Sequence, residues 1–130
     1  PWVEATYPVC RQRACRVIGG ISRGATWSMR LGMAHWDTFA AIGAHSLPGP
    51  PFSAARLRAL LEGIPARSIP SLYLDTGTLD RYRRSAAEYH EMLERFSVPH
   101  QWHIFDGAHD EAYWQAHIPD YLRWYTRQWE

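Results

Sequence analysis

The stretch from Arg16 to Gly24, Arg-Val-Ile-Gly-Gly-Ile-Ser-Arg-Gly, constrains the fold of this chain more than any other part of the sequence. Its β-branched start predicts a short strand over residues 16–19, which leads directly into a G-x-S-x-G pattern. In such a pattern the serine occupies a sharp turn between a strand and a helix, and its Oγ stands free above the sheet. We therefore expect Ser22 at a nucleophile elbow, where Gly20 and Gly24 give the strand and the helix room to pass each other.

Segments typical of strands and helices alternate along the rest of the chain. Three further apolar segments predict strands, at residues 39–44, 71–75 and 101–105. Helical spacing and a terminating proline predict helices at residues 2–7, 25–35, 82–96 and 114–129. The alternation, without an internal repeat, predicts an α/β fold in which helices flank a parallel sheet.

One Pro- and Gly-rich segment interrupts this alternation, at residues 47–70. It holds one short helix, capped by Ser53 and ended by Gly63. We interpret it as a loop excursion near the active site within a single domain that spans residues 1–130. It is too short for a large cap, which predicts an open cleft.

Composition and charge exclude several classes of partner. The chain has 130 residues, of which 46% are hydrophobic, enough for a globular core. All 14 basic residues are Arg and the net charge is +1, so we expect neither nucleic acid nor an anionic membrane as a partner. No segment has the length and apolarity of a transmembrane helix or of a leader peptide, and both a cytoplasmic and a secreted location are compatible with the sequence.

Two features at the amino end carry less information. Cys10 and Cys15 are too few for a zinc site, and a disulfide between them would close a short loop, so they do not indicate a compartment. The first residue is Pro1 rather than Met, from which we expect a start by cleavage or excision.

Reactive groups in open parallel sheets lie where the chain leaves the carboxyl ends of the strands. In this chain the polar side chains at those places are Ser22, His45, Asp80 and His109. The order serine, acid, histidine is the order of the α/β-hydrolase triad. The residues therefore predict Ser22 as nucleophile, Asp80 as the acid and His109 as the base.

Four motifs together resemble one family, the putative-esterase family of α/β hydrolases, whose members include esterase D and enterochelin, feruloyl and acetylxylan esterases. The motifs are Gly-Gly-Ile-Ser-Arg-Gly, Gly77-Thr-Leu-Asp80, Gly107-Ala-His-Asp110 and the aromatic tail from Tyr113 to Trp129. The resemblance implies the same three site residues, Ser22, Asp80 and His109. Two positions depart from the family pattern: Ala25 stands where many relatives have glycine, and Arg23 replaces the usual Met or Gln. Position 23 contributes only its backbone N–H, an oxyanion donor.

Several assignments stay open at this point. Ser22 could be an ordinary turn serine and His109 a surface loop histidine. Asp75 is a rival acid, although its place within a strand suits it better to fixing a neighbouring loop. His45 leaves its strand near the predicted site, so a substrate contact and a core role are both open. The aromatic stripe of the last helix is interpreted as core rather than as a sugar platform.

An α/β-hydrolase sheet normally has strands before the elbow strand, and a loop after one of them supplies the second oxyanion donor. Only 15 residues precede Arg16 here. We therefore interpret the chain as the C-terminal half of a longer esterase, with a bare edge on the strand at residues 16–19. We expect an N-terminal complementing fragment, or a second copy in a homodimer, to fill that edge. The isolated chain should be a poor enzyme, because one lost oxyanion donor costs about 10²- to 10³-fold in rate.

The predicted function is a serine-dependent hydrolase of carboxylic esters that works through an acyl-enzyme, with no metal or organic cofactor. Its substrate would be a small-molecule or polymer-borne ester. An acyltransferase or a serine peptidase is the alternative on the same scaffold. A non-catalytic hydrolase-like fragment that serves as an assembly module is the alternative of another class.

Overall fold

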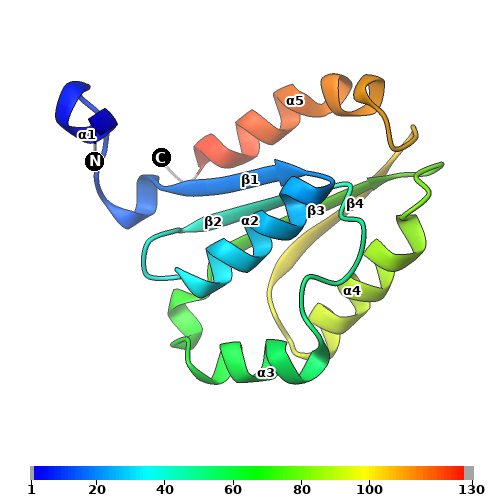
Figure 1. Cartoon of the computed structure of the whole chain (residues 1–130), viewed down its shortest axis with the longest axis horizontal. Coiled ribbons are helices and arrows are strands. Elements are labelled where there is room, and N and C mark those ends of the chain that lie inside the picture. The colour runs from blue at the N-terminus through cyan, green and yellow to red at the C-terminus, as the bar shows by residue number, and fades with distance from the viewer. Residues whose placement is uncertain (1, 128–130) are drawn as a thin grey trace.

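Four parallel strands form the centre of the computed structural model, which describes residues 2–127 (Figure 1). The strands lie side by side in chain order, β1-β2-β3-β4. The elements in chain order are α1 (Trp2–Thr6), the short 3-10 turn η1 (Arg13–Cys15), β1 (Val17–Ile21), α2 (Arg23–Ala34), β2 (Ala41–His45), α3 (Ala54–Glu62), a second 3-10 turn η2 (Ala66–Ser68), β3 (Ser71–Gly77), α4 (Arg83–Arg95), β4 (His100–Phe105) and α5 (Glu111–Thr126). The predicted α/β fold with a parallel sheet is confirmed, and the end of the predicted helix at residues 128–129 lies outside the described residues.

Helices cover both faces of the sheet, as Figure 1 shows: α2, α3 and α4 lie on one face and α5 on the other. On the α2 and α4 face, Ile42 and Ala44 of β2 belong to the larger core cluster, together with buried Met29 of α2 and buried Leu93 of α4. On the α5 face, Ala41 of β2 belongs to the smaller cluster formed with Tyr73, Tyr121 and Trp124. Alternate residues of one strand thus face opposite helix layers, as a doubly covered sheet requires.

The excursion at residues 47–70 is built around a helix that joins the core. Ser53 caps α3, because its Oγ accepts a hydrogen bond from the N–H of Arg56 at 3.3 Å. Leu57 of α3 is fully buried in the cluster shared with α2 and α4. The segment therefore serves as the crossover from the carboxyl end of β2 to the amino end of β3.

The strand that carries the G-x-S-x-G pattern lies at one edge of the sheet. Within residues 2–127, β1 pairs with β2 alone, from Val17 opposite Ala41 to Ile21 opposite His45. Its other edge has no strand partner from the described part of the chain, so the expectation of a bare edge on this strand is confirmed.

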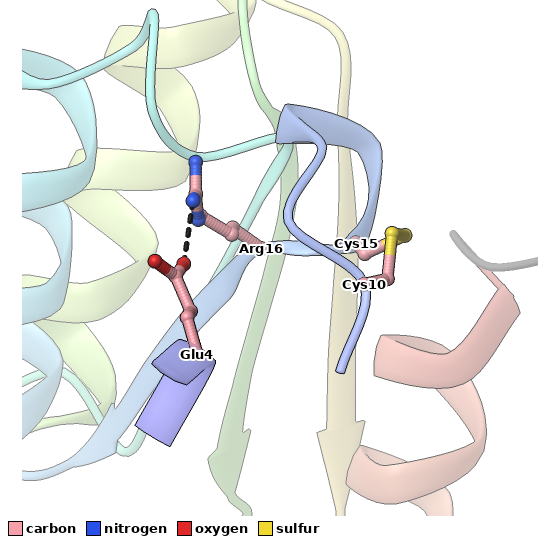
Figure 2. The surroundings of a disulfide bond; sticks show 4 residues. All are labelled: Glu4, Cys10, Cys15 and Arg16. Atoms are coloured by element: carbon pink, nitrogen blue, oxygen red, sulfur yellow. Dashed lines mark hydrogen bonds and ion pairs between the residues drawn. A yellow bond between two sulfur atoms is a disulfide. The ribbon is translucent and has the colours of Figure 1, made fainter. Parts of the chain in front are cut away.

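The segment before β1 is held by a disulfide and by charged contacts. Cys10 and Cys15 form the disulfide, and Glu4 accepts a hydrogen bond from Arg16 at 2.6 Å (Figure 2). This contact with Arg16 lowers the pKa of Glu4. Arg13, in η1, donates to the carbonyl oxygens of Trp36 at 2.7 Å and Ser68 at 2.9 Å. The turn that leads into β1 is thereby attached to the loops at the amino ends of the neighbouring strands.

Among the helices of the described residues, none has both the length and the apolarity needed to cross a bilayer.

Candidate active site

Ser22 occupies the turn between β1 and α2 with a backbone conformation that L-residues rarely adopt, φ 55° and ψ −119°. Its N–H donates to the carbonyl of His45, at the end of the adjacent strand, at 2.8 Å. A Cβ on Gly20 would lie 2.4 Å from the backbone carbon of Gly24, so only glycine fits at position 20. A sharp turn between a strand and a helix, with a serine at its tip, is what a nucleophile elbow requires.

The structure corrects one expectation about this turn. A Cβ on Gly24 would have nothing within 4 Å, so the absence of a side chain at position 24 does not create the close approach. It is the backbone of Gly24 that occupies the space beside Gly20. One glycine, rather than two, is sterically required for the strand and helix to pass.

The loops that follow β3 and β4 are joined to each other along their length. The N–H of Thr78 donates to the carbonyl of Phe105, and that of Leu79 to the carbonyl of Gly107, both at 2.8 Å. A Cβ on Gly77 would lie 2.2 Å from the carbonyl oxygen of Gly107. Because the backbones approach this closely, the positions of Asp80 and His109 are fixed relative to each other.

Three side chains predicted from the sequence converge at the carboxyl edge of the sheet. The Oγ of Ser22 is 2.8 Å from Nε2 of His109, and Nδ1 of His109 lies 2.9 Å from Oδ2 of Asp80. Since a carboxylate only accepts, Nδ1 of His109 carries the proton, and Nε2 is left to accept the hydroxyl proton of Ser22. The predicted convergence, including the pairing of His109 with Asp80 rather than with Asp75, is what the structure shows.

The acid and the histidine of this group are shielded from solvent. The side chain of Asp80 is fully buried and that of His109 is 6% exposed. Oδ1 of Asp80 also accepts the backbone N–H of Tyr82 at 2.8 Å. Burial and this second donor hold the carboxylate in one orientation toward the imidazole.

Two aromatic side chains that sequence reasoning did not assign to the site flank the imidazole. Tyr82 and Trp114 meet the His109 ring edge to face, with centroids 4.9 and 5.2 Å away. The indole N–H of Trp114 donates to Oγ of buried Ser46 at 3.0 Å. The sequence held one sign of each contact: Tyr82 lies two residues after Asp80, and Trp114 lies one turn after the loop of His109. Both residues also fitted the apolar stripe of a helix, so their positions did not single them out.

Arg23 is the first residue of α2, directly after Ser22. A helix leaves its first N–H groups without intrahelical acceptors and carries a partial positive charge at that end. The N–H of Arg23 therefore lies beside the serine with no acceptor inside α2, as an oxyanion donor requires.

His45 and Asp75 lie in a second group, beneath α5. Nδ1 of His45 donates to Oδ1 of Asp75 at 2.6 Å, and Nε2 of His45 accepts from the hydroxyl of Tyr125 at 2.8 Å. Tyr113 and Tyr121 donate to Oδ2 of Asp75 at 2.6 and 2.9 Å. The ring of His45 is buried with both nitrogens engaged, so it is a core residue here and has no nitrogen free for a substrate.

This second group accounts for the rival acid as well. Asp75 is fully buried inside β3, opposite His45 of β2 and His103 of β4. Its carboxylate fixes two tyrosines of α5 rather than a neighbouring loop. Among residues 2–127, the side chains placed closely enough to share a metal ion are His90, Glu94 and His100, which belong to neither group.

Solved structures share this fold over almost the whole chain. An S-formylglutathione hydrolase from Staphylococcus aureus matches 95% of this chain at 25% identity with a TM-score of 0.79, and a ferulic acid esterase matches 98% at 26% identity with a TM-score of 0.80. A fluorophosphonate-binding serine hydrolase of Staphylococcus aureus matches 95% at 23% identity with a TM-score of 0.80. The chain spans 56%, 57% and 59% of the length of these three proteins, respectively.

The sequence model of one family, described as putative esterase, matches residues 1–125. That match covers nearly the entire chain and agrees with the parallel sheet flanked by helices of the solved esterases. The chain belongs to the putative esterase family of the α/β-hydrolase fold.

Proposed function

We propose that this protein is a serine-dependent carboxylic ester hydrolase in which Ser22, His109 and Asp80 form the catalytic triad. The observation that carries the proposal is the unbroken hydrogen-bond chain from Ser22 through His109 to buried Asp80, with the serine on a strained turn. Membership of the putative esterase family and the names of the matched structures, an S-formylglutathione hydrolase and a ferulic acid esterase, support the same reaction class.

The three members of the proposed triad have different roles. Nε2 of His109 removes the hydroxyl proton as Oγ of Ser22 attacks the ester carbonyl, and it then passes that proton to the departing alkoxide. Asp80 holds the imidazole tautomer and stabilises the imidazolium that forms. Water, deprotonated by His109, then attacks the acyl-enzyme, and His109 returns that proton to Oγ of Ser22 as the acid is released.

The negative oxygen of the tetrahedral intermediate needs hydrogen-bond donors. We assign the backbone N–H of Arg23 as one donor, at the positive end of α2. The second donor would come from a loop outside the described sheet, on the side of the open β1 edge. With one donor, activity should be lower by about 10²- to 10³-fold than in the completed enzyme.

The open edge of β1 also calls for a partner, and we propose an N-terminal complementing fragment. Apolar side chains lie exposed on both helices next to this edge: Trp27 and Leu31 on α2, Ile118 and Leu122 on α5. A cavity of about 200 Å³ between β1 and α5 has an almost entirely apolar lining, which includes Ile118 and Leu122. One added strand with its connecting helices would cover the edge, the helices and the cavity together.

Two copies paired across β1 are the alternative occupant of the edge. Light scattering of the purified chain, alone and co-expressed with a segment that has the family's N-terminal strands, distinguishes them. A complementing fragment predicts a stable 1:1 complex with raised esterase activity. A homodimer predicts twice the chain's mass without any fragment, and a soluble monomer in both samples would contradict both proposals.

The substrate class is proposed more broadly, as a small-molecule or polymer-borne ester. The rates of hydrolysis of a nitrophenyl acyl ester and of a peptide nitroanilide distinguish an esterase from a serine peptidase. Addition of a competing alcohol acceptor detects acyl transfer, because an acyltransferase makes a new ester in place of free acid. The proposal predicts ester hydrolysis and little cleavage of the amide.

A non-catalytic assembly module is the competing function, and the open β1 edge is the observation in its favour. Covalent labelling by a fluorophosphonate probe distinguishes the two, because only a serine activated by a base attacks the probe. We expect labelling of the protein and none of its Ser22→Ala variant. Equal labelling of both, or of neither, would support the module.

A further inference from the structure

Two histidines and a glutamate meet at the end of the sheet opposite Ser22. His90 and Glu94 are one turn apart on α4, and His100 is the first residue of β4. One ligand atom from each, a ring nitrogen or a carboxylate oxygen, lies within 4.8 Å of the other two. Because α4 begins beside Asp80 and runs back toward the amino ends of the strands, this cluster is remote from the proposed triad (Figure 1).

His100 is oriented as a metal ligand would be. Its side chain is 1% exposed, and its Nδ1 lies 2.8 Å from the carbonyl oxygen of Val98. A carbonyl only accepts, so Nδ1 carries the proton and the lone pair of the neutral ring is on Nε2. That lone pair faces Nδ1 of His90 at 2.7 Å and Oε1 of Glu94 at 3.7 Å. A backbone carbonyl behind the ring is the usual partner of a metal-bound histidine.

His90 is held in place by a second aromatic ring. Its imidazole stacks on Trp102 of β4, with centroids 5.1 Å apart and planes within 9° of parallel. Burial, and then the neighbouring His100, lower the pKa of His90 against the opposing effect of Glu94 and Glu91. Nδ1 of His90 thus faces the lone pair of His100 from a fixed ring, and a single proton bridges the two nitrogens when no ion lies between them.

We propose that His90, Glu94 and His100 form a binding site for one divalent cation of the zinc type. Two imidazoles and one carboxylate suit Zn²⁺ and its neighbours better than Mg²⁺ or Ca²⁺, which prefer oxygen ligands throughout. Zinc to nitrogen distances of about 2.0–2.1 Å at a tetrahedral angle place two ligating nitrogens roughly 3.3 Å apart. The two rings must therefore separate by about half an ångström, and the proton on Nδ1 of His90 must move to Nε2 of the same ring.

The third ligand completes the site without disturbing the core. The Glu94 side chain is 65% exposed and can turn toward the ion, while water fills a fourth position from the same open side. The ion would tie the last turn of α4 to the first residue of β4, across the turn at Ser97, which has a positive φ of 52°. Its role would be to stabilise this connection rather than to take part in ester hydrolysis.

Isothermal titration of the chelator-treated chain with Zn²⁺ tests the proposal, with a thermal unfolding scan at each metal concentration. We expect one ion per chain and a Tm that rises with the Zn²⁺ concentration. Glu94→Gln should weaken binding by about tenfold or more and His90→Gln more strongly, since even changes behind a ligand cost about 10- to 100-fold. Both side chains are accessible enough for these variants to fold.

Matched substitutions control for unspecific binding. Glu91→Gln makes the same chemical change on an exposed face of α4, and His35→Gln removes an exposed histidine elsewhere. Both should bind Zn²⁺ as the unchanged chain does. Absence of saturable binding in the unchanged protein, or equal losses in Glu91→Gln and Glu94→Gln, would overturn the site. Neither result bears on the triad, because Ser22 labelling is measured separately.

Discussion

Two groups in this molecule share one pattern of bonds, a carboxylate, a histidine and a hydroxyl. At the edge of the sheet the order is Asp80, His109, Ser22, with contacts of 2.9 and 2.8 Å. Beneath α5 the order is Asp75, His45, Tyr125, with contacts of 2.6 and 2.8 Å. Each carboxylate is fully buried and each imidazole is almost so. Connectivity and burial therefore do not distinguish a catalytic triad from a structural network.

What differs is the surroundings of the hydroxyl and the other partners of the carboxylate. Ser22 lies at the start of α2 on a strained turn, where helix N–H groups can stabilise negative charge. The hydroxyl of Tyr125 instead lies over the backbone of Gly19 and Gly43, and burial followed by the charge of Asp75 raises its pKa. Asp75 is further occupied by two tyrosine hydroxyls. The second group is suited to fixing α5 on the sheet.

The largest expected difference between the two groups is the loss of activity when a residue of the proposed triad is replaced. Ser22→Ala or His109→Ala should lower kcat/KM by about 10⁴- to 10⁶-fold, and the double variant should lose little more, because the residues act as a unit. Tyr125→Phe, which removes the corresponding hydroxyl of the second group, should stay within about tenfold of the unchanged protein. Ester hydrolysis measures all four. Additive losses, or a comparable loss in Tyr125→Phe, would contradict the assignment.

Replacement of the two carboxylates should affect different properties, kcat in one case and the free energy of unfolding in the other. Asp80→Asn should lower kcat by about 10⁴-fold with the fold retained, because the imidazole loses its orienting acceptor. Asp75→Asn should lower the free energy of unfolding by about 2–4 kcal/mol, because an amide N–H₂ then faces hydroxyl or imidazole donors in a buried site. Urea unfolding and kcat, measured on both variants, test this. A stable Asp75→Asn protein would show that its network does little to hold α5.

The turn at Ser22 offers a pair of matched glycine variants. Gly20→Ala should cost about 1–3 kcal/mol or more and displace Ser22, since the new Cβ would overlap the backbone of Gly24. Gly24→Ala meets no atom within 4 Å and should stabilise α2 by up to about 1 kcal/mol. Thermal unfolding and fluorophosphonate labelling give both readouts. Similar behaviour of the two variants would mean that the turn does not depend on the contact at Gly20.

Much of this architecture could be predicted because it follows from local pattern. All four strands and their parallel direction were expected from apolar runs between helical segments, and the three triad candidates from their places after strands. Boundaries were less accurate: β3 continues to Gly77 rather than ending at Asp75, because its backbone pairs with β4 up to Phe105. α2 begins at Arg23, two residues early, because the helix starts directly at the strained serine.

The second group could not be predicted, because its contacts join residues far apart in sequence. His45 and Asp75 meet only through the register of β2 against β3, and Tyr125 reaches them from α5, 80 residues after His45. The sequence placed His45 correctly near the carboxyl end of a strand, but nothing local shows that its ring turns under α5. His100 lies within ten residues of its partners His90 and Glu94, and they meet because the chain turns at Ser97 and β4 runs back along α4.

The smallest expected effect concerns the tyrosines that donate to Asp75, whose ionisation should make the stability depend on pH. Burial, then the charge of Asp75 and its hydrogen bond, raise the pKa of Tyr113 and of Tyr121 above the ordinary value near 10. Above about pH 10 the unfolded chain loses protons that the folded chain keeps, so the free energy of unfolding should fall by about 1.4 kcal/mol per pH unit for each tyrosine. Below that pH the contribution is fully present and constant.

Urea unfolding between pH 8 and about 11 measures this slope, since the range brackets the ordinary tyrosine pKa. Tyr113→Phe and Tyr121→Phe should each make the slope shallower, although both lower the stability at pH 8 because a buried carboxylate loses a donor. Tyr7→Phe, at an exposed position, controls for the loss of a phenol elsewhere. If the slope is the same in all variants, the hydroxyls around Asp75 are not held protonated by the fold, and the second group is less closed to solvent than its burial indicates.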